Sequence, residues 1–133
     1  MDSSVLLRVI QGAPGALADW PTIDPVSSQL ITVECLRAID RARLRNPKDE
    51  LITARDRIAV LEALATFYLA PIDDAVLTRA ADPFPTAVGS RDAIHLATAL
   101  GLRSEYPDMR FVTHDAELAI AARSMGFDVL GVY

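Results

Sequence analysis

The sequence predicts an α/β domain in which a central, mostly parallel sheet is flanked by helices. Short apolar segments alternate with longer amphipathic ones, as strands and crossover helices do along such a chain. Apolar residues make up 51% of the 133 residues, which is enough for a folded core. No Gly-, Ser- or Pro-rich linker divides the chain, so residues 1–133 are expected to form a single domain.

The first part of the chain is predicted to be mostly helical. Residues 3–10 form a helix that starts from a serine cap and stops at the Gly- and Pro-rich segment after it. Residues 22–26 are a strand candidate, weakened by the proline within them. Residues 27–46 are expected to form a long helix, capped by Ser27 or Ser28 and stopped by the proline that follows it.

A second long helix is predicted from Asp49 to about Tyr68. Apolar residues such as Leu51, Ile58 and Leu61 occur on nearly all of its sides. A helix with this pattern is buried on more than one side, against its own core and against another chain. We therefore expect this helix to form an interface with a second copy or with a partner protein.

The second part of the chain alternates strand and helix as parallel sheets do. The expected order is a strand at 68–72, helices at 73–81 and 90–100, a strand at 110–113, a helix at 115–126 and a final strand at 128–133. The ligand site of such a sheet lies beyond the carboxyl ends of its strands. Asp115 directly follows a predicted strand and is therefore a candidate site residue.

The composition excludes several classes of protein. Cys35 is the single cysteine, so an internal disulfide is impossible and a reducing compartment, the cytoplasm, is favoured. We expect no signal peptide and no membrane span, because the longest apolar stretch is shorter than the roughly 20 residues that cross a bilayer. The net charge of −5 argues against nonspecific wrapping of nucleic acid, but a nuclease with a carboxylate metal site would also be acidic.

Two acids at predicted helix starts, Asp92 and Asp115, allow a structural and a functional interpretation. An acid in the first turn stabilises a helix by about 0.3–1 kcal/mol, and capping alone would explain both residues. They could also be catalytic, because both lie where a sheet of this kind binds ligands. His95 and His114 have no partners at ligand spacing, so structural histidines are favoured over a zinc site.

Glu34 raises a similar alternative. A helical wheel places it in a polar stripe with Arg37, Arg41 and Arg45. The stripe is either a solvated face with Glu–Arg pairs or an acid at a metal site beside arginines that contact a phosphate backbone. The helix by itself does not decide between them.

Four segments together resemble one known family, the PIN domains. MDSSVLL, TVECLRA, SRDAIHLATAL and VTHDAEL occur in the order and at roughly the separations of that family. The resemblance covers essentially the whole chain and is strongest to the VapC toxins of bacterial toxin–antitoxin pairs. Its most specific part is RDAIHLATAL followed by VTHDAEL. The resemblance implies a three-layer PIN-like fold with a central sheet.

The resemblance also implies a site and a function. Its catalytic and metal-holding acids are Asp2, Glu34, Asp92 and Asp115, with Mg²⁺ or Mn²⁺ as the ion. Ser4 supports the first acid and Thr113 lines the same pocket. The implied activity is that of a toxin that hydrolyses RNA. From the arginine stripe beside Glu34, we then expect Arg37 and Arg41 to contact the RNA backbone. The implied partners are a second copy, giving a homodimer, and a small antitoxin that covers the site.

The sequence departs from the family pattern at its start. The family has an apolar strand before the first acid, whereas only Met1 precedes Asp2 here. The first strand is therefore expected to be truncated, which leaves the edges of its neighbours unpaired. We expect the natural product to be longer by a few apolar residues.

The chemistry of four clustered acids favours metal-assisted hydrolysis. Two carboxylates about 5 Å apart repel by roughly 3 kcal/mol at an effective dielectric constant of about 20. Hard divalent cations relieve this repulsion, and they activate water so that no protein nucleophile is needed.

Two other classes remain as alternatives. A phosphate-handling receiver or phosphatase-like domain needs a lysine near the phosphate, and the only lysine, Lys48, stands beside Pro47 between two helices. The second alternative is a PIN-like scaffold that has lost catalysis and only binds a partner protein or RNA.

Overall fold

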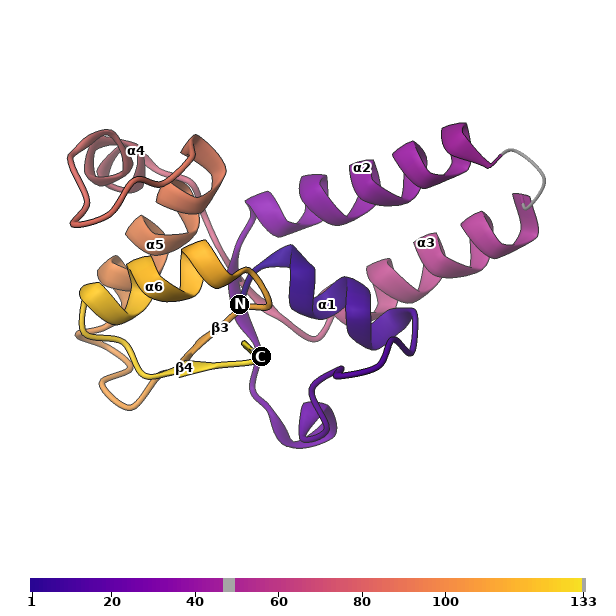
Figure 1. Ribbon diagram of the computed structural model, residues 1–133, viewed down its shortest axis with the longest axis horizontal. Coiled ribbons are helices and arrows are strands. Elements are labelled where there is room, and N and C mark those ends of the chain that lie inside the picture. The colour runs from indigo at the N-terminus through magenta and orange to yellow at the C-terminus, as the bar shows by residue number, and fades with distance from the viewer. Residues whose placement is uncertain (47–49, 133) are drawn as a thin grey trace.

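The structure is a computed structural model and describes residues 1–46 and 50–132 (Figure 1). Its helices are α1 (Ser3–Ile10), η1 (Trp20–Thr22, a 3₁₀ helix), α2 (Leu30–Arg45), α3 (Glu50–Leu64), α4 (Asp74–Ala81), α5 (Ser90–Leu102) and α6 (Ala116–Ser124). Its strands are β1 (Val26–Ser28), β2 (Tyr68–Ala70), β3 (Phe111–Val112) and β4 (Val129–Leu130). The predicted order of helices and strands is thus confirmed.

The strands pair in parallel, as the alternation with helices predicts. β1 pairs with β2 with Val26 opposite Tyr68, and β3 pairs with β4 with Phe111 opposite Val129. Within residues 1–46 and 50–132 these pairs form two separate two-stranded sheets and not one continuous sheet. The α/β class is confirmed, whereas a single central sheet is not seen.

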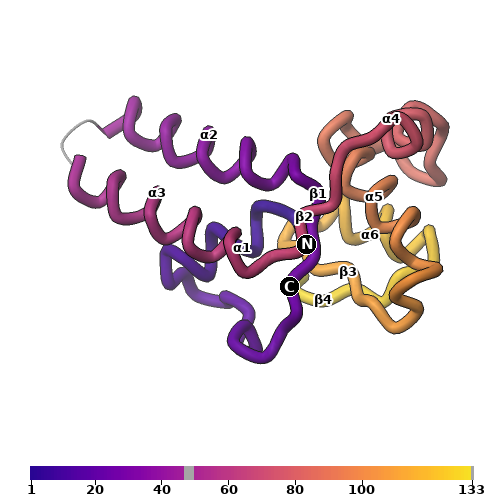
Figure 2. The backbone as a smooth tube through the Cα atoms, turned by 180° about the vertical axis from the view of Figure 1, so that it is seen from behind, coloured from indigo at the N-terminus to yellow at the C-terminus, as the bar shows by residue number. Residues whose placement is uncertain are grey.

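The two residues before α1 lie between these sheets, where the truncated strand was expected. The amino group of Met1 donates a hydrogen bond to the carbonyl oxygen of Val26 at 3.1 Å. The next amide, that of Asp2, donates to the carbonyl oxygen of Val112 at 3.2 Å. Successive residues thus bond to opposite neighbours, as residues of an inner strand do. The N-terminus accordingly lies beside β3 in Figure 1 and beside β1 and β2 in Figure 2.

Two helix boundaries differ from the predictions, at residues that belong to strands. The helix predicted to about Tyr68 ends at Leu64, because the amides of Thr66 and Phe67 bond three residues back in a turn; Tyr68 begins β2 and donates its amide to the carbonyl of Pro25. The predicted start of that helix, Asp49, lies outside the described residues. Ser27 and Ser28 belong to β1 and not to the following helix, although the hydroxyl of Ser28 still accepts a hydrogen bond from the first helical amide.

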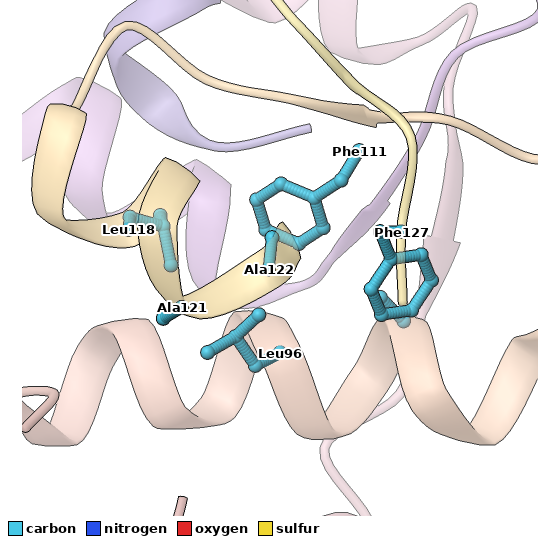
Figure 3. Close-up of a cluster of buried hydrophobic side chains, with 7 residues drawn as sticks. Leu96, Phe111, Leu118, Ala121, Ala122 and Phe127 are labelled. Atoms are coloured by element: carbon cyan, nitrogen blue, oxygen red, sulfur yellow. The ribbon is translucent and has the colours of Figure 1, made fainter. Parts of the chain in front are cut away.

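The hydrophobic core has two parts on either side of the strands. One part joins α5, β3 and α6 and is shown in Figure 3; its buried residues are Leu96, Ala99, Phe111, Leu118, Ala121, Ala122 and Phe127. The other joins α1, α2 and α3 through Leu6, Ile31, Cys35, Ile39, Val60 and Leu64. The site described below lies where α1, α2, α5 and α6 begin, between these two parts.

Helices α2 and α3 form a long antiparallel hairpin that extends away from the rest of the molecule (Figures 1 and 2). Val60 and Leu64 bury one side of α3 against α1 and α2. Leu51, Ile58 and Leu61 are instead 81%, 56% and 47% exposed. In the single chain α3 therefore exposes several large apolar side chains, with Arg55 and Glu62 exposed on the same side. Among the described helices, none is long and apolar enough to cross a membrane.

Candidate active site

Asp2 is buried and is held by two hydroxyl groups. The Ser4 hydroxyl donates to Oδ1 at 2.7 Å, and the Thr113 hydroxyl donates to Oδ2 at 2.9 Å. Asp2 occupies the N-cap position of α1, where a serine cap was predicted, but its side chain makes no capping bond. The carboxylate is aimed instead at β3, so its placement depends on a strand far along the chain.

Asp115 is the N-cap of α6, as the structural interpretation predicted. Its Oδ1 accepts hydrogen bonds from the amides of Glu117 at 2.9 Å and Leu118 at 3.0 Å. Its own amide donates to the Thr113 hydroxyl at 3.0 Å. Thr113 therefore contacts both Asp2 and Asp115, and fixes the end of β3 relative to the start of α1. The capping role and a place in the acid cluster are compatible.

Asp92 lies in the first turn of α5 and is half-buried. The N-cap of α5 is Gly89, and not Ser90 as the sequence suggested, because Ser90 is already helical. Burial raises the pKa of Asp92 above its ordinary value, and the charges of Asp115 and Asp2 raise it further. The structure thus brings Asp2 and Asp115, from two other helix starts, close enough to Asp92 to disfavour its charge.

Glu34 is buried, so of the two interpretations left open for the polar stripe, the solvated face does not hold at this residue. Its Oε2 lies 2.6 Å from Nε2 of His95, and its Oε1 lies 3.7 Å from a guanidinium nitrogen of Arg91. The wheel placed Glu34 with the arginines of α2, but it shares the buried side of that helix with Ile31 and Cys35. A polar residue on a helical wheel faces solvent only when no polar group of another element lies against it. Here α5 supplies two such groups, the side chains of His95 and Arg91.

The buried thiol of Cys35 lies close to both Glu34 and Asp2. Burial raises the pKa of this thiol to about 12, and the charges of Glu34 and Asp2 contribute to the shift. Glu34 therefore lies in the same region as Asp2, while its own contacts are with His95 and Arg91 of α5.

The arginines predicted to contact RNA lie on the exposed side of α2. Arg37 forms an ion pair with Asp40 at 2.9 Å, and Arg43 binds the other oxygen of the same carboxylate at 2.9 Å. Arg41 is exposed. The arginine that reaches an acid of the cluster is Arg91, which the sequence reading did not single out. The sequence feature that could have identified Arg91 is its spacing: it stands four residues before His95, so both lie on one face of α5.

The donor set has the chemistry that a hard divalent cation prefers, namely carboxylate oxygens with little competing sulfur or imidazole. The raised pKa of Asp92 indicates uncompensated negative charge that a cation would offset. As the side chains stand, however, no three acidic, Cys or His residues of the described chain form a group that could hold a metal ion. Metal binding by these residues requires their side chains to shift.

Comparison with known proteins identifies the family. Residues 1–124 match the family model described as PIN domain, which spans every acid of the cluster. No curated protein and no solved structure matches the chain. PIN domains are generally metal-dependent nucleases, hydrolases that act on nucleic acids. With the parallel strands and the acids gathered at the helix starts, this match over nearly the whole length shows that the chain belongs to the PIN domain family.

Proposed function

We propose that the chain is a Mg²⁺-dependent endoribonuclease, with Mn²⁺ able to replace Mg²⁺, that acts as the toxin of a toxin–antitoxin pair. One observation carries the proposal: the half-buried carboxyl of Asp92, whose pKa is raised by burial and by Asp115 and Asp2. A protein that only needed helix caps at these positions would gain nothing from bringing the carboxylates together. A divalent cation turns the same repulsion into binding energy.

The residues we assign to the ion are Asp2, Glu34, Asp92 and Asp115. When bound, a divalent ion supplies an activated water and offsets the charge that develops on the phosphodiester. The chain's own residues orient the acids: Ser4 and Thr113 hold Asp2, and two amides of α6 hold one oxygen of Asp115.

We assign substrate and partner contacts to the α2–α3 hairpin. Arg37 and Arg41 are proposed to contact the RNA backbone from the exposed side of α2. The exposed apolar side of α3 is proposed to bury Leu51, Ile58 and Leu61 against a second copy or an antitoxin. A toxin that cleaves cellular RNA would act in the cytoplasm, which we propose as its location. We also propose that residues 1–133 form one domain. The two short sheets are proposed to be halves of the central sheet of a three-layer fold.

A second candidate function is a scaffold that binds RNA or a partner without cleaving RNA. The observation that favours it is the lack, among the described residues, of three side chains already arranged around a metal position. Cleavage and binding assays separate the two functions.

The test uses end-labelled tRNA and ribosomal RNA fragments with the purified chain. We expect cleavage with Mg²⁺ or Mn²⁺, and loss of cleavage with EDTA and in Asp92→Asn purified in parallel. Full cleavage by Asp92→Asn or in excess chelator would refute the proposal. RNA binding without cleavage in either metal would favour the scaffold.

A further inference from the structure

The buried carboxylate of Glu34 has a different cationic or hydrogen-bonding partner on each oxygen. His95 Nε2 lies 2.6 Å from Oε2, and both side chains are almost fully buried, at 3% and 8% exposure. Arg91 lies 3.7 Å from Oε1, and its side chain is 70% exposed. The short contact is a buried hydrogen bond that joins His95 Nε2 of α5 to Glu34 Oε2 of α2. The two contacts therefore differ in length, burial and strength.

Both partners come from one face of α5, on either side of Asp92. Arg91 and His95 are four residues apart, so they lie one above the other on the helix. Glu34 comes from α2, 61 residues before His95. A buried carboxylate without a partner is costly, and removing one member of a buried pair leaves the other uncompensated. The contact with His95 is thus what keeps the Glu34 carboxylate at this position between the two helices.

We propose that His95 is the positioning residue for Glu34. It occupies Oε2 and leaves Oε1 available to a cation, while the exposed Arg91 supplies an exchangeable countercharge at Oε1 when no cation is bound. This inference rests on the proposed metal-dependent function, and it assigns opposite effects to the two residues of α5. Loss of His95 weakens cation binding because Glu34 is no longer held, whereas loss of Arg91 removes a competing positive charge and does not weaken it.

The experiment measures Mn²⁺ binding to the whole chain by electron paramagnetic resonance or calorimetry, without RNA. We expect His95→Leu to weaken Mn²⁺ binding by about tenfold or more, as losses of residues that orient metal ligands do. His95→Gln, which retains a donor at the end of the side chain, is expected to recover most of that affinity. Arg91→Ala is expected to bind Mn²⁺ at least as tightly as the wild type. In cleavage assays His95→Leu should lower kcat with little change in KM.

Thr98→Val is the matched control, since Thr98 is buried on the same helix and its hydroxyl donates to the carbonyl of Ile94 within that helix. It should leave Mn²⁺ affinity unchanged, and circular dichroism checks that each variant is folded. If His95→Leu is folded and binds Mn²⁺ like the wild type, the positioning role is wrong and the metal-dependent function stands. Equal weakening by His95→Leu and His95→Gln, or weakening by Arg91→Ala to the same extent, also overturns it. If the wild type binds no Mn²⁺, both proposals fail.

Discussion

The hydroxyl of Thr113 donates a hydrogen bond to Oδ2 of Asp2 across 111 positions of sequence, at 2.9 Å in a buried environment. The same oxygen of Thr113 accepts the amide of Asp115 at 3.0 Å. One side chain at the end of β3 thus orients the first acid and supports the start of α6. A threonine is suited to this position because its hydroxyl both donates and accepts.

Thr113→Val should therefore cost more stability than its nearly unchanged size suggests. Valine removes both hydrogen bonds and leaves the buried Asp2 carboxylate with one partner fewer, which we expect to lower the free energy of unfolding by about 1–3 kcal/mol. Urea unfolding at neutral pH measures the change. Thr113→Ser retains the hydroxyl and is the control. Equal stability of the valine variant and the wild type would show that the contact with Asp2 contributes nothing.

Asp92→Asn is expected to abolish metal-dependent cleavage while leaving the melting temperature equal to or above that of the wild type. The raised pKa means that the folded protein disfavours the ionised form of Asp92. Ionised Asp92 therefore costs stability above its folded pKa, and this cost disappears below the ordinary value of 3.8, where the folded and unfolded chains are both protonated.

Thermal unfolding without metal over a range of pH tests whether the ionised Asp92 lowers the stability of the fold. The melting temperature of Asp92→Asn should exceed that of the wild type most at neutral pH, and the difference should shrink toward pH 3.8. Asp108→Asn, at an exposed acid, is the control and should show no such trend. A difference that grows as the pH falls would contradict the cause given for the pKa shift.

Replacing Arg37 and Arg41 with alanine should weaken RNA binding irrespective of sequence and flatten its salt dependence. If each residue neutralises one phosphate of a single strand, the slope of log affinity against log salt should decrease in magnitude by about 1.4. Fluorescence anisotropy at several salt concentrations measures the slope. The double variant of Arg110 and Arg123, two exposed arginines elsewhere, is the control. An unchanged slope would mean that the exposed face of α2 is only solvated.

The exposed apolar side of α3 should be an interface. Ile58→Glu places a charge on that side and should convert a dimer to monomers, or abolish antitoxin binding, with little effect on folding because Ile58 is 56% exposed. Ile120 on α6 is also 56% exposed, so Ile120→Glu is a control matched in residue type and exposure. Light scattering at micromolar concentration reports the association. A monomeric wild type that also binds no co-encoded small protein would refute this interface.

Cys35 should be unreactive in the folded protein. Its pKa of about 12 leaves on the order of one thiol in ten thousand ionised at pH 8, and its side chain is buried. We expect Ellman's reagent to react at least about 100-fold more slowly with the native chain than with the chain in guanidinium chloride. Comparable rates in the two conditions would mean that the neighbourhood of Glu34 and Asp2 opens readily.

The sequence alone was sufficient for features that depend on neighbours within a few positions. Apolar spacing predicted the order of helices and strands, and the acid before α6 was correctly interpreted as its cap, because capping bonds span only two or three residues. The predicted helix boundary was wrong after Leu64, where the chain makes a turn that brings Tyr68 into β2 beside the distant Pro25.

Only the tertiary structure decided which faces meet. The helical wheel left Glu34 open between a solvated face and a metal site. The structure buries it, because α5 places His95 and Arg91 beside it and a carboxylate is buried only where such partners exist. The pairing of Asp2 with Thr113 likewise needs the start of α1 to lie against β3. Contacts of this kind depend on how elements distant in sequence pack, and periodicity along one helix contains no information about the helix or strand that will face it.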